Sequence, residues 1–468
     1  MQAPYDRSDA ASIYEYSAGL INKCLRDFWH EGMPLIDGKG GYAQMVEEIF
    51  FKYKPNSDPG PDFKEAGLEL KCTGLKRLKD DSLAIKERLV CGMIDYCEVV
   101  KEDFEQSHFY TKCQLMLILF YLYVKGADKL DYEFLYRVLW KLPEKDLLII
   151  RNDYKVIIDK IRRGEAHLLS EGDTVYLAAC RKGQKDSALR EQPFSAIRAK
   201  GRAFSLKPSY MRNVLEFLMQ SGENHACNFN LYETKSITSL EELKGGSFEQ
   251  VILRRFDPFM GKNYLAICDQ LGIKHSTAKH KYSIIANGIV TSKISDVNDS
   301  DEFKKSGITM KTIRVGKAGT IKESMSFENI DYCEVAECDS WEDSRLYEIF
   351  TSRFLFVAYR QTENSIELPN GKVEPEYVLD KAFFWTMSAE DLEDAERYWL
   401  DIKKKVMQNR IKLGNFYKLS DDKKFHVRPK AKNKASNFFT AVNPNGGHCE
   451  RLCYWFNASF VKKIIEEN

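Results

Sequence analysis

The prediction of the fold starts from the stretch Pro61–Thr73, PDFKEAGLELKCT. It places Asp62, Glu69 and Lys71 in the spacing D-x6-E-x-K. Residues two apart on a β-strand point to the same face, so the side chains of Glu69 and Lys71 are predicted to project together. A turn over 64–67, to which Gly67 is suited, would fold Asp62 back beside Glu69. The stretch therefore predicts two strands that bring two carboxylates and an ammonium to one site.

Those residue types suit the cleavage of a phosphodiester. Mg²⁺ prefers oxygen ligands and usually takes one or two carboxylates together with phosphate oxygens and water. A lysine beside the metal can hold the attacking water and offset the charge that develops on the phosphate. The same spacing also occurs on solvated strand edges, so the pattern alone is a modest signal.

The surrounding residues strengthen it. The segment KPNSDPGPDFKEAGLELKCTGLKRL (54–78), followed by SLAIKERLV (82–90), resembles the GATC-cutting restriction endonucleases related to the mismatch-repair enzyme MutH. The resemblance implies a type II restriction endonuclease that hydrolyses GATC sites in duplex DNA with Mg²⁺, leaves 5′-phosphates and works beside a GATC methyltransferase. It also implies that Asp62, Glu69 and the Leu70 carbonyl bind the metal and that Lys71 orients the water.

Two further catalytic residues follow from the same resemblance. A helix predicted over 42–53 carries a metal-facing glutamate in the relatives, fourteen residues before the aspartate, which is Glu48 by an ungapped count. Alignment from the preceding glycines would select Glu47 instead. The choice is close, and we take Glu48 because the segment before Asp62 then needs no insertion. The element SHFYTK resembles an S-H-x-x-x-K element whose lysine belongs to the active site, which gives Lys112. His108 is interpreted as structural.

A basic block predicts contact with DNA. Lysines and arginines with interleaved aromatic residues can bind phosphates or reach guanine edges in the major groove. The block contains Arg181, Lys182, Lys185, Arg190, Arg198, Lys200, Arg202 and Lys207. A solvated charged surface is the alternative, but the resemblance places base-reading loops here. Our DNA-binding candidates in the block are Arg181, Lys182, Arg202 and Lys207.

The chain also repeats itself. EFKKSGITMKT (302–312) echoes DFKEAGLELKCT (62–73), and IKESMSFENIDYCEV (321–335) echoes IKERLVCGMIDYCEV (85–99). We therefore predict an α/β protein with two tandem restriction-endonuclease-like domains, each a mixed central sheet flanked by helices. The predicted bounds are 1–220 for the catalytic domain, 221–246 for a linker and 247–468 for a degenerate second copy.

The second copy differs where chemistry is expected. Glu302 and Lys311 correspond to Asp62 and Lys71, but Thr309 replaces Glu69. A threonine hydroxyl carries no charge and binds Mg²⁺ poorly, so this copy is predicted to lack catalysis. An R-P-K element resembles the DNA-reading segment of MutH and gives Arg428 and Lys430 as DNA-binding candidates. A DNA-binding effector domain is therefore predicted, with a purely structural remnant of the duplication as the alternative.

Composition narrows the class of protein. The 468 residues carry a formal charge of +1, so positive charge for DNA must be local. The sequence contains no Cys-x-x-Cys pair of the kind that binds zinc. The longest apolar run, Leu115–Val124, is too short for a bilayer, and we predict a cytoplasmic protein without membrane contact.

A dimer on DNA is also considered. Two other functions remain open: a MutH-like mismatch-repair nicking enzyme and a non-catalytic GATC-binding regulator.

The chain between these motifs predicts the remaining elements. Apolar spacing predicts helices over 13–30, 131–141 and 153–163. Strands are predicted over 89–100 and 112–124, the second almost wholly apolar and therefore central.

Overall fold

The computed structural model describes residues 4–36, 41–55, 60–78, 81–86, 88–182, 189–228, 235–292, 296–421, 424–430 and 438–468. They form two compact units: Met1–Ser247 with Lys304–Ser306, and Phe248–Phe303 with Gly307–Asn468. Residues 221–246, predicted as a linker, contain strand β10 (His225–Cys227) and helix α7 (Leu240–Lys244) and are grouped with the first unit. Independent folding of the two parts remains a prediction.

The first unit is built on a mixed sheet. Its strands are β1 (Glu69–Arg77), β2 (Leu83–Ile85), β4 (Leu115–Leu122), β5 (Phe134–Lys141) and β10, in the order β10-β5-β4-β1-β2. β1 runs parallel to β4, and β5 runs antiparallel to β4. As predicted, the apolar strand β4 is central, and it is buried at all but its two end residues. The mixed sheet confirms the predicted α/β class.

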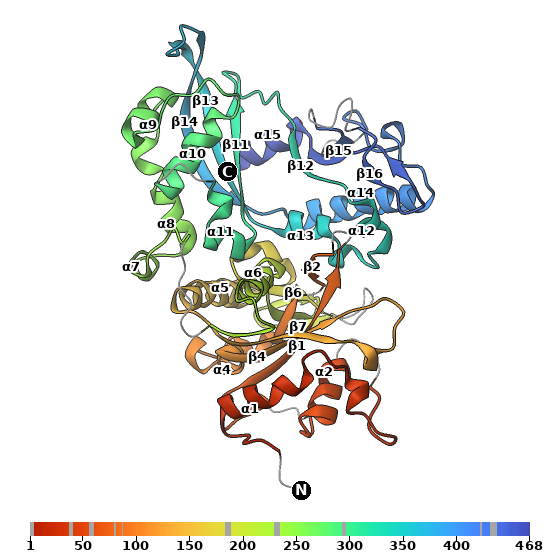
Figure 1. Cartoon of the computed structure of the whole chain (residues 1–468). Coiled ribbons are helices and arrows are strands. Elements are labelled where there is room, and N and C mark those ends of the chain that lie inside the picture. Colours follow the sequence, from red (N-terminus) through yellow and green to blue (C-terminus); the bar gives the residue numbers. More distant parts are fainter. Residues whose placement is uncertain are drawn as a thin grey trace. The chain divides into compact units, whose positions relative to one another are not determined.

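Helices cover this unit on both sides. Figure 1 shows α1 (Ala10–Tyr16) and α2 (Gly41–Met45) on one side of the strands and α5 (Glu144–Arg162) and α6 (Pro208–Gln220) on the other. A smaller antiparallel sheet has the order β3-β9-β6, with β3 at Leu89–Met93, β6 at Leu177–Arg181 and β9 at Arg202–Leu206. The short strands β7 (Arg190–Gln192) and β8 (Ser195–Ala199) form a separate hairpin. The first unit thus carries the predicted mixed sheet flanked by helices, together with the smaller sheet and the hairpin.

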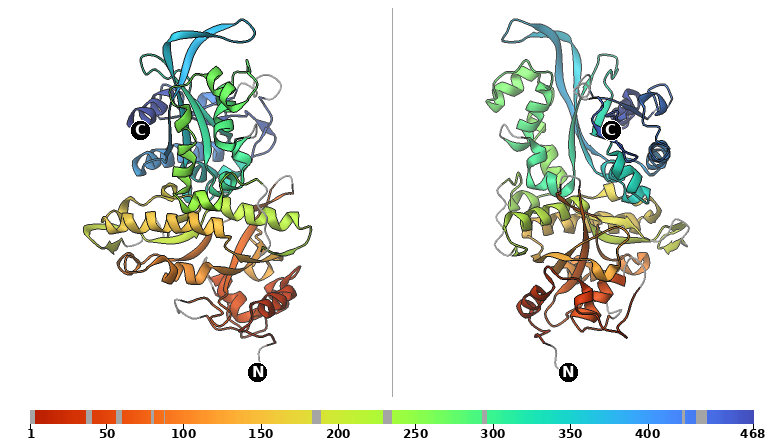
Figure 2. Two further views of the ribbon diagram at one scale, coloured as in Figure 1. Left: turned by 90° about the vertical axis from the view of Figure 1, so that its left-hand side faces the viewer. Right: turned by 45° about the vertical axis from the view of Figure 1, so that its right-hand side comes forward.

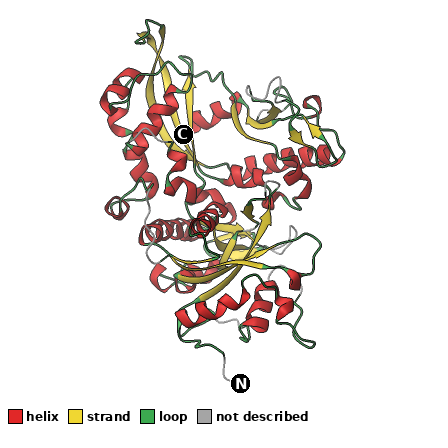
Figure 3. Cartoon of the chain, in the orientation of Figure 1, coloured by secondary structure: helices red, strands yellow, loops and turns green. Residues whose placement is uncertain are grey.

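The second unit begins with helices and continues with the same strand plan. Its helices are α8 (Phe248–Arg254), α9 (Tyr264–Leu271), α10 (Lys281–Thr291), α11 (Asp301–Ser306), α12 (Tyr332–Glu337), α13 (Arg345–Thr351), α14 (Ala389–Met407) and α15 (Ala458–Glu467). One sheet has the order β11-β13-β14, formed by Thr309–Val315, Phe354–Glu367 and Val373–Trp385. Figure 2 shows the β13–β14 hairpin extending beyond the rest of this unit. The alternation of helices and strands in both units can be followed in Figure 3.

The repeat in the sequence is a repeat in topology. The second small sheet, β12-β18-β15, consists of Met325–Asn329, Cys453–Phe456 and Phe425–Arg428 and matches β3-β9-β6 in order and direction. A two-stranded ribbon, β16 (Ala441–Val442) with β17 (His448–Cys449), completes the unit. Parallel pairing of β11 with β13 repeats that of β1 with β4. The predicted duplication is therefore visible in the fold.

The shared hexapeptide IDYCEV adopts the same local structure twice. Asp95 caps helix α3 (Tyr96–Val99) by accepting hydrogen bonds from the Cys97 and Glu98 amides. Asp331 does the same for α12 with the amides of Cys333 and Glu334. A side-chain oxygen at this position satisfies amides that a helix start leaves without partners. The identity of sequence thus reflects a shared helix start.

Several predicted elements are wrong. Residues 131–141 were predicted as a helix, but from Phe134 onward they form strand β5, because the apolar residues pair with β4 and β10 on both edges. The helix predicted over 13–30 ends as α-helix at Tyr16 and continues as short 3₁₀ turns; Asn22 has a positive φ of 60°, which an α-helix excludes. The strand predicted over 89–100 stops at Met93, where Asp95 starts α3. The helix predicted over 153–163 is confirmed as the second half of α5.

Candidate active site

The predicted turn brings Asp62 to Glu69. Phe63 and Leu68 exchange backbone hydrogen bonds of 3.0 and 3.1 Å, and the Gly67 amide donates to the Lys64 carbonyl at 3.1 Å. Gly67 has a φ of +62°, a conformation that costs glycine little. The chain therefore reverses between the two acids, as the spacing predicted.

Each of the two acids is also tied to the backbone of the other segment. Asp62 Oδ2 accepts from the Leu70 amide at 2.9 Å, and Glu69 Oε2 accepts from the Asp62 amide at 3.2 Å. These reciprocal bonds hold the carboxylates side by side at the start of β1. Glu69 is 2% exposed, so its charge lies in a region of low dielectric.

Two lysines meet the same carboxylate. The Nζ atoms of Lys71 and Lys112 lie 2.6 and 3.5 Å from Glu69 Oε1. Lys112 stands on helix α4 (His108–Cys113), which the Ser107 hydroxyl caps by accepting from the Tyr110 amide. That helix leads directly into β4, the parallel neighbour of β1. Four predicted residues (Asp62, Glu69, Lys71 and Lys112) are thus assembled at one site.

The charges at this site act on one another. Burial and the Glu69 carboxylate raise the pKa of Asp62 to about 6, against the opposing effect of Lys71. Burial alone would lower the pKa of Lys71, but the Glu69 carboxylate raises it above the ordinary lysine value. Lys71 is therefore a cation and a hydrogen-bond donor at neutral pH, not a base.

One of the two glutamates on the preceding helix lies near these charges. Burial, Asp62 and Glu69 raise the pKa of Glu47 to about 7, while Lys71 and Lys112 oppose the rise. Glu47 therefore lies within electrostatic reach of the whole cluster, which favours it over Glu48; the catalytic role of either residue stays a prediction. Both residues belong to a π-helical turn, Val46–Phe50, where an extra residue in the turn shifts the faces on which side chains project. Alignment from the glycines was the signal that pointed to Glu47.

The donor set fits Mg²⁺. Within the described residues, no three His, Cys, Asp or Glu side chains gather closely enough to enclose a metal ion by themselves. Two adjacent carboxylates with a third nearby are nevertheless what Mg²⁺ takes when water and phosphate complete its shell. Burial is the main cause of the raised pKa values of Asp62 and Glu47, and the neighbouring carboxylates add to it. The role of the Leu70 carbonyl remains a prediction. His108 is exposed and pairs with Glu102, in agreement with its omission.

The basic block divides into exposed and buried residues. Arg181 and Lys182 are exposed at the end of β6. Arg202 and Lys207 are 7% and 6% exposed. Arg202 donates to the carbonyls of Ala179 and Leu169, and Lys207 donates to the Thr174 carbonyl. We correct the prediction for Arg202 and Lys207: they stabilise backbone inside the unit, because the strand RAFSL that begins with Arg202 is buried throughout. Lys185 lies outside the described residues.

The counterpart site in the second unit has lost its acids. Thr309 pairs with Phe354 in the register that Glu69 has with Met116. Glu302 lies buried in helix α11 rather than in a hairpin turn. Lys112 has no counterpart either, since Ile349 stands at its position on α13, five residues after the capping Ser344. The second unit therefore lacks the catalytic set.

The DNA-binding candidates of the second unit lie at the end of β15 and just after it. Arg428 closes the strand, with its guanidinium 4.0 Å from the centre of the Trp455 ring, and Lys430 follows. Both are partly exposed. The neighbouring Lys423 and the residues 431–434 lie outside the described residues.

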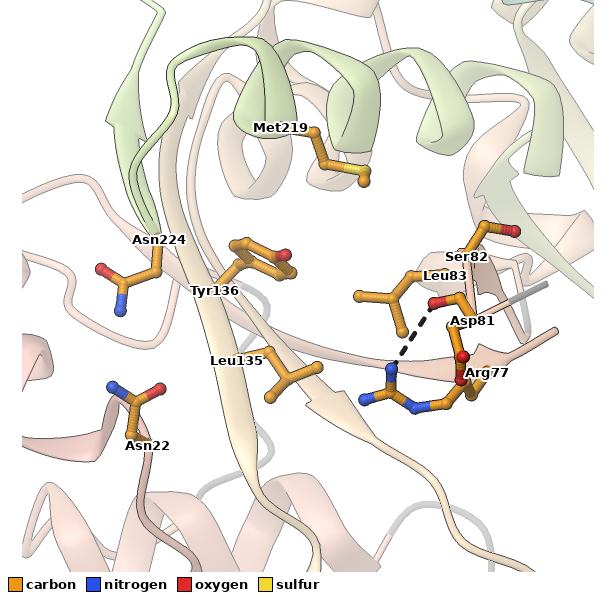
Figure 4. A pocket seen from close by; sticks show the side chains of 9 residues that line it. All are labelled: Asn22, Arg77, Asp81, Ser82, Leu83, Leu135, Tyr136, Met219 and Asn224. Carbon is orange, nitrogen blue, oxygen red and sulfur yellow. Dashed lines mark hydrogen bonds between the residues drawn. The ribbon is translucent and has the colours of Figure 1, made fainter. Parts of the chain in front are cut away.

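A pocket lies elsewhere in the first unit and contains none of these residues. Figure 4 shows its lining by Asn22, Arg77, Asp81, Ser82, Leu83, Leu135, Tyr136, Met219 and Asn224. Arg77 and Glu69 are the two ends of the nine-residue strand β1, which separates the pocket from the acids by roughly 26 Å. This pocket is not the nuclease site.

The hairpin with its paired acids and lysines lies in the part of the chain that matches a nuclease family. Residues 51–153 match the family model described as DNA mismatch repair enzyme MutH, and this range spans the hairpin and Lys112. The type II restriction enzyme Sau3AI of Staphylococcus aureus is 32% identical over 482 residues, covering 93% of this chain and 94% of that enzyme. The chain therefore belongs to the MutH-like type II restriction enzymes of the Sau3AI kind and is a deoxyribonuclease. Among the helices of the described residues, none has the length and apolar character needed to cross a membrane.

Proposed function

We propose that the enzyme recognises GATC in duplex DNA and hydrolyses both strands with Mg²⁺, leaving 5′-phosphate and 3′-hydroxyl ends. The observation that carries this proposal is the meeting of Lys71 and Lys112 on the Glu69 carboxylate, with Asp62 bound back to the same strand. The similarity to a restriction enzyme, which extends over both units, supports it.

The residues divide the chemistry among them. Bound by Asp62, Glu69 and the Leu70 carbonyl, Mg²⁺ would supply Lewis-acid stabilisation of charge on the phosphate. Lys71, kept protonated by Glu69, donates hydrogen bonds that orient the attacking water. Lys112 approaches the same oxygen from the neighbouring helix and contacts a phosphate oxygen. Glu47 adds a third carboxylate. Its pKa is about 7 without metal, and a bound cation would favour its ionised form.

Binding of DNA rests on local positive charge. The formal charge of the chain is +1, so affinity depends on clusters that release counterions from DNA. Arg181 and Lys182 are exposed at a strand end in the first unit, and Arg428 and Lys430 occupy the matching strand end in the second. We propose that the second unit binds a GATC duplex without cutting it and promotes cleavage by the first.

The enzyme would act in the cytoplasm beside a methyltransferase that protects host GATC sites, and it would pair on DNA. Incubation of the purified protein with an unmethylated plasmid and Mg²⁺, followed by sequencing of the ends, tests the proposal. Double-strand ends at GATC with 5′-phosphates are expected. Nicks that require a mismatch-repair partner would favour the repair enzyme instead, and GATC binding without any cleavage would favour a regulator.

A further inference from the structure

The second unit keeps one member of the catalytic set, Lys311. It pairs with Phe356 across β11 and β13 as Lys71 pairs with Ile118 across β1 and β4. Each lysine is the third residue of its strand, two residues after Thr309 and Glu69 respectively. The main chain therefore presents Lys311 at the place where the first unit presents a catalytic lysine.

The partners of this lysine have changed. In the part of the chain that the structure describes, the hydrogen-bond acceptor for Lys311 Nζ is the Ser326 carbonyl at 3.1 Å, and the Phe327 ring lies 5.0 Å away. An ammonium has three donors, so two remain for another acceptor. The carboxylate that acts on Lys311 electrostatically is Glu328. Glu328 is already bound by Arg345 at 2.6 and 3.1 Å.

Two further cations, Arg428 and Lys430, stand at the end of β15 and just after it. Lys430 acts electrostatically on Lys311. Arg428 stacks on Trp455, and within the described residues its buried Nε atom has no hydrogen-bond partner. Trp455 pairs with Ser326 across β18 and β12, which connects Arg428 to the strand that contacts Lys311. We call Lys311, Arg428 and Lys430 the Lys311 cluster.

The electrostatics of the two sites are opposite. Burial and Lys430 lower the pKa of Lys311 to about 8, whereas the pKa of Lys71 is raised by Glu69. The first site has an excess of negative charge that suits a cation. The Lys311 cluster has an excess of positive charge that suits an anion with several acceptor oxygens.

We propose that the Lys311 cluster binds an oxyanion of the phosphate class, and that this oxyanion is a backbone phosphate of DNA held by the second unit. The second half of the proposal rests on the proposed function of that unit as a DNA-binding effector. The site in the first unit would bind a metal ion and cleave a phosphodiester. The Lys311 cluster in the second unit would bind a phosphate and leave it uncut. Ile349 and Thr309 remove the groups that would catalyse cleavage, and Lys311 is retained for binding.

The test uses the full chain without divalent cations, so that no DNA is cut, in two arms. In the first, inorganic phosphate is titrated while the Lys311 ammonium is followed by NMR, its signal being assigned by its absence in Lys311→Met. Phosphate is expected to raise the pKa of Lys311, because an anion stabilises the charged lysine. In the second, affinity for an unmethylated GATC duplex is measured across salt concentrations.

Lys311→Met is expected to weaken duplex binding by roughly tenfold and to lower the salt slope by about one. The matched control is Lys317→Met, which removes the same charge from an exposed lysine paired with Glu363. Lys311→Arg should restore duplex binding. Melting temperatures of the variants are measured alongside, because Lys311→Met also removes the donor to the Ser326 carbonyl, and rescue by Lys311→Arg separates lost binding from lost stability.

Each outcome decides one part. Unchanged duplex affinity together with no response of Lys311 to phosphate would overturn the proposal. A response to phosphate with unchanged duplex affinity would support the oxyanion site and assign it to free phosphate, overturning the DNA source. Failure of the wild type to cut GATC with Mg²⁺ would overturn the proposed function, while the phosphate arm would still decide whether the Lys311 cluster binds an oxyanion.

Discussion

The Nζ atom of Lys71 lies 2.6 Å from Oε1 of Glu69, two residues earlier on the same strand. This ion pair joins the residue that would bind metal to the residue that would orient water. Removal of Glu69 therefore alters two functions at once: a metal ligand is lost, and Lys71 loses the carboxylate that keeps it protonated and in place.

The first prediction concerns Glu69→Ala. Cleavage is expected to fall by a factor on the order of a thousand or more, with affinity for a GATC duplex within a few-fold of wild type, because the basic residues that grip DNA are elsewhere. The matched control is Glu65→Ala, which removes an exposed glutamate from the same turn. Initial cleavage rates and duplex affinities measure the outcome. Normal cleavage by Glu69→Ala would refute the site.

The second prediction separates the two helix glutamates. Glu47→Gln is expected to slow cleavage about 10- to 100-fold, as loss of an outer carboxylate at a metal site does, and to raise the Mg²⁺ concentration needed for half-maximal rate. Glu48→Gln should change neither, since Glu47 is the residue coupled to Asp62 and Glu69. Rates across a Mg²⁺ titration distinguish them. A larger effect of Glu48→Gln would restore the original assignment.

The third prediction is a pH dependence of stability without metal. Folding raises the pKa of Asp62 to about 6 and of Glu47 to about 7, so the folded state binds more protons than the unfolded state above about pH 4. Their contribution to stability is complete below that pH and is lost as pH rises through 6 to 7. The melting temperature should therefore fall between pH 5 and 8 by less in Glu47→Gln than in wild type.

Mg²⁺ should reverse that effect, because it binds the ionised carboxylates of the folded state. The comparison is wild type against Glu47→Gln, with and without Mg²⁺, by thermal unfolding at both ends of the pH range. Glu48→Gln serves as the control and should follow wild type. Identical pH profiles for wild type and Glu47→Gln would show that the pKa of Glu47 is not raised, and would contradict its place beside Asp62 and Glu69.

Strand β1 and the turn before it could be predicted from the sequence, because the residues that form them are close together in the chain. The spacing of Asp62, Gly67, Glu69 and Lys71 fixes a turn and a strand face without reference to the rest of the chain. The repeat likewise predicted the second unit, since identical sequence at IDYCEV gives identical helix starts. Lys112 required the resemblance, because nothing local to it indicates that α4 leads into a strand beside β1.

What sequence could not supply depends on tertiary packing. Residues 131–141 carry enough apolar spacing for a helix, but pairing on both edges makes them a strand. Arg202 was assigned to DNA because it belongs to a dense basic block where the resemblance places base-reading loops, yet two backbone carbonyls hold it inside the unit. Glu47 and Glu48 could not be separated, because a π-helical turn alters which side chain faces the site. These outcomes are set by neighbours distant in sequence.

The fourth prediction follows from the buried arginine. Arg202→Ala is expected to destabilise the protein by about 2–4 kcal/mol, because the carbonyls of Ala179 and Leu169 lose a charged donor in a buried region. Arg181→Ala, across the same strand pair, should change stability little and weaken duplex binding instead. Unfolding midpoints and duplex affinities are measured for both variants. Arg202→Ala should lower the midpoint, and Arg181→Ala should lower the affinity. Weakened binding by Arg202→Ala at unchanged stability would contradict the correction made above.

The last prediction tests the second unit as an effector. If it binds a GATC duplex and promotes cleavage by the first unit, plasmids with two GATC sites should be cut faster than plasmids with one, because tethering raises the effective concentration of the second site. Coupling between sites is typically worth about 1–3 kcal/mol, or roughly 5- to 150-fold in rate if it acts fully on cleavage. Initial rates on matched one-site and two-site plasmids measure the difference.

Arg428→Ala should reduce that difference while leaving the residues at Asp62 unchanged. Arg428 stacks on Trp455 at the end of β15, so its loss weakens the grip of the second unit on DNA without removing a catalytic group. The control is Arg397→Ala, an exposed arginine on α14 that pairs with Asp394. It should preserve the two-site advantage. If the second unit were only a structural remnant, wild type would cut both plasmids equally fast, and Arg428→Ala would alter stability or nothing. Equal wild-type rates on the two plasmids would therefore end the effector proposal.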